Sequence, residues 1–261
     1  MAGSFRFKRF TIRNDKAALK VGTDAVLLGA AMTVSPDDRT LLDIGTGTGV
    51  IALMVAQRLL GELPHQMLIV ERASAGGTLW GEAPRQKIAE MRIFAIDIDG
   101  PSAEEAAENF TDSPWASALT AIHTSLAGFK PERKFDCIFS NPPFYDNSLR
   151  NPDAREATAR HTESLSYREI FAFSAEWLTP AGRLSLILPA DQEVAILRTA
   201  ASFGLYPFRI IRIKGAPRKP VKRIILEFSQ TRGQVAEESL TLQDGPSRSA
   251  QYAELTQEFY L

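Results

Sequence analysis

Residues 40–60 contain a strand, a glycine-rich turn and a helix in direct succession. The apolar run Thr40–Ile44 predicts a buried strand, and the residues from Gly49 to about Leu60 predict a helix rich in apolar side chains. Between them, Asp43-Ile44-Gly45-Thr46-Gly47-Thr48-Gly49 lets the backbone turn sharply and lets a ligand approach without a clash against Cβ atoms. A strand that leads through a short turn into a helix indicates a parallel α/β sheet.

The alternation of strand and helix continues along the chain. Helices are expected after two capping boxes, Ser102 with Glu105 and Ser166 with Glu169, and after Asp191. We expect an α/β fold with a doubly wound, mostly parallel, seven-stranded sheet whose last strand is antiparallel and whose ligands bind at the carboxyl ends of the strands. The expected strands cover residues 40–44, 92–97, 119–123, 135–140, 184–188, 209–214 and 222–228.

The chain is expected to form a single domain over residues 1–261. Residues 1–39 precede the first strand as an N-terminal segment. Residues 59–91, which are rich in glycine and proline, are too long for a connection in a compact α/β unit, and we interpret them as an insertion. Residues 235–261 form a largely acidic appendage, which we expect to pack on an edge of the sheet.

Composition excludes several classes of protein. No apolar run approaches the roughly 20 residues that a membrane span needs. One cysteine and 3 histidines exclude a disulfide framework and a Cys/His zinc cluster. Because the first residues also lack the apolar core of a secretory signal, we expect a cytoplasmic protein. We also expect a monomer that binds neither a membrane nor a metal.

Basic residues gather in two stretches, although the net charge is only -1. The first 20 residues include Lys8 and Arg9, and residues 209–223 contain no acidic residue. Each stretch is either a solvated face or a surface for a nucleic-acid backbone. Four residues of the second stretch are candidates for such contacts: Arg218, Lys219, Lys222 and Arg223.

The spacing of the glycines in the turn distinguishes between two classes of nucleotide cofactor. A dinucleotide-binding turn, G-x-G-x-x-G/A, would need glycine or alanine where Val50 stands, which argues against a nicotinamide oxidoreductase. The pattern D-x-G-x-G-x-G, with Asp43, Gly45, Gly47 and Gly49, resembles that of class I methyltransferases. This resemblance implies a Rossmann-like fold and S-adenosylmethionine as cofactor, with Asp43 suited to its ammonium group.

An acidic residue is also expected at the ribose of the cofactor. Asp97 ends the second strand, where a carboxylate accepts hydrogen bonds from ribose hydroxyls, and Ile98 follows it. Glu71 is the rival, since it also follows an apolar run. Methyltransferases often place an acid after the third strand for the adenine amino group, and Ser125 or Thr124 stands there in this chain.

The sequence Ser140-Asn141-Pro142-Pro143-Phe144 follows the fourth strand directly. The prolines hold the backbone extended, so the Asn141 side-chain oxygen and the Pro142 carbonyl are both able to accept hydrogen bonds from one NH2 group. These two hydrogen bonds would orient the lone pair of the amine nitrogen toward a methyl donor, and Phe144 offers an aromatic face on which a base stacks. We expect catalysis by positioning, through Asn141, Pro142, Pro143 and Phe144.

The Asn-Pro-Pro-aromatic signature resembles amino-methyltransferases, which include adenine-N6 enzymes and glutamine-N5 enzymes that modify release factors. Further segments resemble the bacterial family of N6-methyltransferases that modify adenine 37, beside the anticodon of a valine tRNA, over about residues 5–228. The insertion at 59–91 departs from that family. The segments that carry the resemblance are 20–29, with Lys20-Val21-Gly22-Thr23-Asp24, then 97–99, 108–110, 113–115 and 159–162.

The resemblance implies a tRNA substrate and roles for further residues. Residues 1–39 would form a lid and RNA-facing segment, with Lys20, Gly22, Thr23 and Asp24 against the cofactor. Arg160 and His161 would face RNA phosphates, with a general base as the alternative for His161. Two other functions stay open: glutamine-N5 methylation of a protein, and a non-catalytic RNA-binding module.

Overall fold

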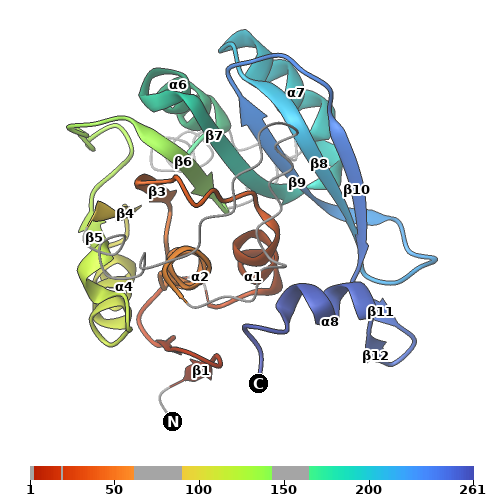
Figure 1. The fold of residues 1–261 in the computed structure, drawn as a ribbon, viewed down its shortest axis with the longest axis horizontal. Coiled ribbons are helices and arrows are strands. Elements are labelled where there is room, and N and C mark those ends of the chain that lie inside the picture. The colour runs from red at the N-terminus through yellow and green to blue at the C-terminus, as the bar shows by residue number, and fades with distance from the viewer. Residues whose placement is uncertain (1–2, 19, 62–89, 143–164) are drawn as a thin grey trace, which may run out of the picture.

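The structure is a computed structural model that describes residues 3–18, 20–61, 90–142 and 165–261. Its centre is an eight-stranded sheet in the order β10-β8-β9-β7-β6-β3-β4-β5 (Figure 1). The strands are β3 Thr40–Ile44, β4 Arg92–Asp97, β5 Leu119–His123, β6 Phe135–Ser140, β7 Leu178–Pro189, β8 Tyr206–Lys214, β9 Val221–Ser229 and β10 Ala236–Thr241.

All seven predicted strands are confirmed, and the pairing is parallel except at one strand. The antiparallel strand is β9, which pairs antiparallel with both β7 and β8. The C-terminal appendage adds an eighth strand that the sequence did not predict, because β10 pairs in parallel with β8 at the sheet edge. The appendage thus packs on an edge of the sheet, as expected.

Helices cover both faces of the sheet (Figure 1). One face carries α1 Thr23–Ala31, α2 Val50–Leu60, α4 Gly100–Thr111 and α8 Ala250–Thr256, whose buried side chains share one apolar core. The other face carries α6 Tyr167–Trp177 and α7 Glu193–Ser202 over a second core. Short elements are β1 Ser4–Arg6, β2 Thr11–Arg13, η2 Ala116–Ala118, η3 Ala190–Gln192, β11 Gln243–Asp244 and β12 Ser247–Arg248.

One of the three predicted helix N-caps is correct and two are wrong. The capping box of Ser166 with Glu169 is confirmed at α6. The box of Ser102 with Glu105 is wrong, because Asp99 is the N-cap of α4 and accepts a hydrogen bond from the Ser102 backbone. The cap predicted at Asp191 is also wrong, since this residue lies inside η3 and α7 begins two residues later.

The N-terminal segment runs along α4 toward the carboxyl ends of the strands. Glu105 is buried, and its carboxylate accepts hydrogen bonds from the backbone N–H groups of Asp15, Lys16 and Ala17 at 2.6, 2.8 and 2.8 Å. Residues 20–24 therefore arrive at the edge of the sheet where ligands bind in α/β folds. Of the expected insertion, residues 59–60 belong to α2, and residues 62–89 lie outside the described residues.

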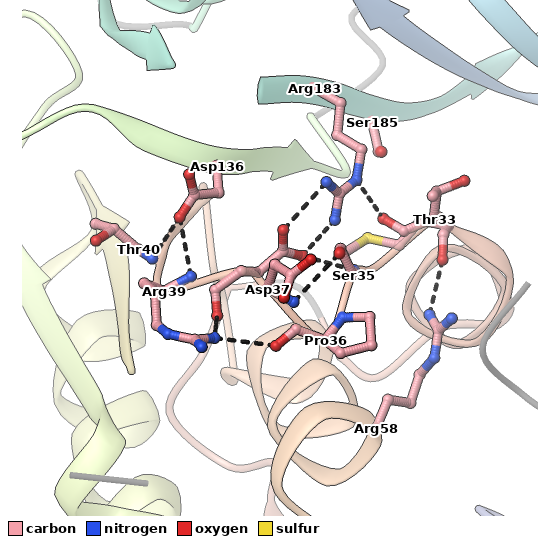
Figure 2. Close-up of polar contacts among 12 residues, drawn as sticks. Thr33, Ser35, Pro36, Asp37, Arg39, Thr40, Arg58, Asp136, Arg183 and Ser185 are labelled. Atoms are coloured by element: carbon pink, nitrogen blue, oxygen red, sulfur yellow. Dashed lines mark hydrogen bonds and ion pairs between the residues drawn. The ribbon is translucent and has the colours of Figure 1, made fainter. Parts of the chain in front are cut away.

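A buried polar network fixes the connection between α1 and β3 (Figure 2). The Arg183 guanidinium donates to the Thr33 carbonyl at 2.8 Å and forms an ion pair with Asp38. Arg58 donates to the carbonyls of Gly29 and Met32, at the end of α1, at 3.0 and 2.8 Å. Removing one partner of such a buried ion pair costs about 3–5 kcal/mol, so the network holds α1 in place against the sheet.

No helix among the described residues has the length and apolar character of a membrane span.

Candidate active site

Three sequence-predicted segments meet at the carboxyl edge of the sheet. In the strand register, Ile44 lies opposite Ile96 on one side and Ser140 on the other. The next residues along these three strands are Gly45, Asp97 and Asn141, which therefore stand side by side. The Ser140 hydroxyl also donates to the Ile44 carbonyl at 2.7 Å, which ties the end of β6 to the end of β3.

The glycine turn needs its glycines for two different reasons. Gly45, Gly47 and Gly49 have φ angles of 71°, 56° and 80°, a left-handed conformation that costs other residues about 1–2 kcal/mol. A Cβ atom on Gly49 would lie 2.5 Å from the Phe110 ring, so this glycine serves packing. A Cβ atom on Gly45 would meet none of the described residues within 4 Å, so they leave the space above this backbone open to a ligand.

Asp97 lies against the glycine turn, as expected. Its two carboxylate oxygens accept backbone N–H groups from Gly47 at 2.8 Å and from Asp99 at 2.9 Å. Burial raises the pKa of Asp97 above its ordinary value. A carboxylate offers about four lone-pair directions, so Asp97 retains acceptor capacity for hydroxyl groups. The rival Glu71 lies outside the described residues.

Asp43 is a fully buried acid beneath the glycine turn. One oxygen accepts a hydrogen bond from the Thr46 hydroxyl at 2.7 Å, and Oδ1 has no partner among the described residues. Burial is the main cause that raises the pKa of Asp43 to about 7, and the charge of Asp97 adds to it. A cation beside Asp43 would lower this pKa, because it would stabilise the charged carboxylate.

Asn141 presents a second unpaired acceptor. Its Oδ1 atom is buried and has no hydrogen-bond partner among the described residues. An unpaired buried polar atom costs about 1–3 kcal/mol, so its isolation at a strand end indicates a ligand donor. Pro142 follows it and is buried, whereas Pro143 and Phe144 lie outside the described residues.

The far side of the edge is formed by residues after β4 and β5. Ile98 is 56% exposed, although it is a large apolar side chain directly after a buried strand. The His123 ring forms a 3.0 Å hydrogen bond with the Ile98 carbonyl, a contact the sequence analysis missed although His123 pairs with Asp97 in the β4–β5 register. Ser125 accepts a hydrogen bond from the Gly128 backbone at 3.1 Å.

Comparison with known proteins gives one family. No family model matches the chain. A tRNA1(Val) (adenine(37)-N6)-methyltransferase from Bacteroides fragilis is 37% identical over 261 residues, covering 98% of this chain and 97% of that protein. The proteins of the same name from Flavobacterium johnsoniae and Vibrio vulnificus YJ016 are 36% and 35% identical, each over 98% of this chain and over 99% and 95% of their own length. The chain belongs to the tRNA1(Val) (adenine(37)-N6)-methyltransferase family.

Solved structures agree on the fold. A predicted O-methyltransferase from Agrobacterium tumefaciens superposes with a TM-score of 0.61 at 16% identity, covering 90% of this chain and 96% of that one. A candidate class I S-adenosylmethionine-dependent methyltransferase from Listeria monocytogenes gives a TM-score of 0.51 at 14% identity, over 83% and 62%. The fold of this tRNA1(Val) (adenine(37)-N6)-methyltransferase family member is therefore that of class I methyltransferases.

The segment before α1 reaches the same edge in this family member. Lys20 donates from its side chain to the Asp15 carbonyl at 2.9 Å, and Gly22 is the extended N-cap residue of α1, directly before Thr23. Asp24 forms an ion pair with Arg223 at 2.7 Å. This ion pair attaches the start of α1 to the start of β9.

The predicted RNA-contacting residues of the two basic stretches lie at opposite ends of the molecule. Arg218 and Lys219 lie in the turn from β8 to β9, with Lys222 beyond it, at the edge that holds the glycine turn. The hairpin with Lys8 and Arg9 contacts the other end of the molecule, since the Lys8 backbone donates to the Phe259 carbonyl and the Arg9 side chain lies near Gly61, after α2.

Arg160 and His161 lie outside the described residues. Among the residues that the structure describes, no group of His, Cys, Asp and Glu side chains is arranged to hold a metal ion. A cavity of about 350 Å³ lies under the C-terminal appendage, lined by Met32, Arg58 and Leu240 among others. It adjoins the end of α1 and the end of α2, opposite the candidate site, and plays no part in it.

Proposed function

We propose that the protein transfers a methyl group from S-adenosylmethionine to the N6 atom of an adenine in tRNA, adenine 37 of tRNA1(Val). The observation that carries this proposal is the buried, unpaired Oδ1 atom of Asn141 at the end of β6, beside the glycine turn. An amide oxygen held ready in this way suits the amine of a planar base. Family membership supplies the same substrate through the names of the relatives.

The residues at the edge fit the cofactor. S-adenosylmethionine, when bound, supplies a methyl group on a sulfonium that is already a good leaving group. Asp43 would neutralise its ammonium group directly or through water, because its buried carboxylate lacks a cationic partner among the described residues. Asp97 would accept hydrogen bonds from the ribose hydroxyls, and Ile98 would cover the adenine.

The other cofactor residues support these contacts. The open backbone at Gly45 lets the cofactor lie close to the chain, next to Gly47. Ser125 would approach the adenine of the cofactor, because its hydroxyl oxygen accepts from the Gly128 backbone and its proton is left to donate to a ring nitrogen or a water molecule. Thr23 and Asp24 would close the site from the start of α1.

Catalysis would follow from position. Asn141 Oδ1 and the Pro142 carbonyl would each accept one N–H of the adenine amine, which directs the nitrogen lone pair toward the methyl group. Holding the two reacting atoms in this geometry removes most of the entropy cost of the reaction. The N6–carbon bond would form as the sulfur–methyl bond breaks, which leaves S-adenosylhomocysteine. The surplus proton of the methylated amine would pass to water, so the site needs no strong base. Pro143 would keep the backbone extended, and Phe144 would stack on the base.

The substrate edge carries the charges that a tRNA backbone needs. Arg218, Lys219 and Lys222 would contact phosphates around the anticodon loop, and Arg160 and His161 would add contacts from the loop after Phe144. Lys8 and Arg9, at the opposite end of the molecule, would meet a more distant part of the tRNA. Turning one base out of an unpaired loop costs little free energy, so an anticodon loop is a suitable substrate for this site. The protein would meet this tRNA in the cytoplasm.

The proposal is tested by incubation of the protein with labelled S-adenosylmethionine and total tRNA from a strain that lacks the gene. We expect the label in N6-methyladenosine at position 37 of tRNA1(Val), mapped by mass spectrometry of nuclease digests. Label in a glutamine of a release factor, in parallel reactions, would support the N5-glutamine alternative instead. Cofactor binding without any methyl transfer would indicate an RNA-binding module.

A further inference from the structure

Tyr167 carries a buried hydroxyl group that has no hydrogen-bond partner among the described residues. Its ring packs against the apolar core under α6 and α7. The ring is therefore held by packing, while the hydroxyl forms no hydrogen bond with the part of the chain that the structure describes. Leaving a buried hydroxyl unpaired costs about 1–3 kcal/mol, which a phenylalanine at this position would avoid.

The start of α6 brings Tyr167 to the edge of the sheet that carries the candidate active site. Tyr167 is the first residue of α6, and the capping box of Ser166 with Glu169 fixes the start of that helix. Since α6 connects the end of the β6 segment to the start of β7, it begins at the carboxyl edge of the sheet and runs back along it. Asn141 stands at the same edge, at the end of β6.

Neighbouring charges agree with this placement. Burial raises the pKa of Tyr167 to about 12, and Arg223 and Asp191 also act on it electrostatically. Asp191 follows β7, and Arg223 lies opposite Pro189, the last residue of β7, in the β7–β9 register. The Tyr167 hydroxyl is therefore within electrostatic range of residues at the end of β7, and it stays protonated at neutral pH.

The order of the strands separates the two halves of the site. The glycine turn and Asp97 follow β3 and β4, so the cofactor occupies that side. Asn141 follows β6, and β7 is the next strand away from the cofactor. A base whose amine is held by Asn141 and faces the cofactor extends its ring toward β7 and Tyr167.

We propose that Tyr167 is a positioning residue for the target base, whose hydroxyl donates a hydrogen bond to a ring nitrogen that flanks the exocyclic amine. This inference rests on the proposed function. Asn141 and Pro142 use both N–H groups of the amine, so the groups that remain beside it, N1 and N7, only accept hydrogen bonds. A protonated tyrosine is a suitable donor to them, and it fixes the rotation of the ring about its amine.

The Tyr167→Phe variant tests the proposal, because it removes only the hydroxyl. We expect kcat/KM for tRNA to fall about 10-fold, as for the loss of one hydrogen bond, while the affinity for S-adenosylmethionine stays within about 2-fold. The melting temperature should not fall, since the hydroxyl has no hydrogen-bond partner among residues 3–18, 20–61, 90–142 and 165–261. The Tyr206→Phe variant is the control, because Tyr206 begins β8 at the opposite edge and should leave all three values unchanged.

Substrate analogues identify the partner atom. In tRNA with 1-deazaadenosine or 7-deazaadenosine at the target position, the wild-type protein should lose about 10-fold in kcat/KM with one of the two analogues. The Tyr167→Phe variant should lose nothing further with that analogue. Unchanged kcat/KM in Tyr167→Phe would overturn the inference, and so would a lower melting temperature with an equal loss of cofactor affinity, which would assign a structural role.

The two proposals fail in different ways. A wild-type protein that does not methylate the adenine of the tRNA at all would refute the proposed function, and the inference with it. A wild-type protein that methylates it, alongside an equally active Tyr167→Phe variant, would refute the role of Tyr167 alone.

Discussion

Alanine at three glycines separates backbone strain, packing and ligand space. Gly45, Gly49 and Gly204 have φ angles of 71°, 80° and 73°, so alanine costs about 1–2 kcal/mol at each from backbone strain alone. At Gly45 and Gly204 a Cβ atom would meet no atom within 4 Å in the part of the chain that the structure describes. At Gly49 it would lie 2.5 Å from Phe110 and 3.3 Å from Ala106, and overpacking of a core adds about 1–3 kcal/mol.

The expected loss of unfolding free energy is therefore about 1–2 kcal/mol for Gly45→Ala and Gly204→Ala, and about 2–5 kcal/mol for Gly49→Ala. Urea unfolding followed by tryptophan fluorescence measures these values. Isothermal titration with S-adenosylmethionine then separates the first two variants. Gly45→Ala should lose at least about 10-fold in affinity, because its methyl group occupies the space of the ligand, whereas Gly204→Ala should bind normally.

Gly204 is a suitable control because it follows α7 at the edge opposite the candidate site. Normal cofactor affinity in Gly45→Ala would refute the placement of the cofactor over the glycine turn. Equal stability of Gly49→Ala and Gly204→Ala would refute the packing argument at Phe110.

Two further predictions concern charge. Asp43 has a pKa of about 7 in the folded protein, above its ordinary value, so the free energy of unfolding should fall as the pH rises from about 4 to 7, while cofactor affinity should rise from pH 6 to 7 as the carboxylate ionises. Asp43→Asn should flatten both profiles, measured by urea unfolding and by titration calorimetry, and an unchanged profile would show that another group titrates. Replacing Arg218 and Lys219 by alanine should lower the slope of log affinity for tRNA against log salt by about 2, as two phosphate contacts are lost. Arg232 follows β9 at the opposite end of the strands, so Arg232→Ala should leave that slope unchanged. If Arg232→Ala lowered the slope as much as the loss of Arg218 and Lys219 does, the predicted position of the tRNA contacts would be wrong.

Short-range patterns predicted most of the fold. The apolar runs of the seven strands, the alternating glycines and the capping box at Ser166 are all encoded within a few residues. The function of Glu105 was not readable in this way, because its hydrogen-bond partners are 88–90 residues away in the sequence. Asp99, closer to the start of α4, took the capping role instead.

The eighth strand was missed for a similar reason. In β10 only Leu240 is buried, so the segment has no alternating apolar pattern. It is attached to the sheet by parallel pairing with β8 and by an ion pair of Glu238 with Arg209 at 2.6 Å, both between distant parts of the chain.

The candidate site was predictable where parallel topology decides it. Residues that follow neighbouring parallel strands meet at one edge, which brought Gly45, Asp97 and Asn141 together. Tyr167 was not predictable, because an aromatic residue at the start of a capped helix is typical of a core contact. Only the packed structure shows that its hydroxyl is buried without a partner among the described residues.

If Asn141 holds the amine that receives the methyl group, the Asn141→Ala variant should lose methyl transfer and keep cofactor binding. Single-turnover methyl transfer is measured with saturating S-adenosylmethionine and tRNA, next to calorimetric cofactor binding. We expect a rate at least about 100-fold lower, with cofactor affinity within about 2-fold of the wild type. A rate close to that of the wild type, or a loss explained by weaker cofactor binding, would contradict this role of Asn141.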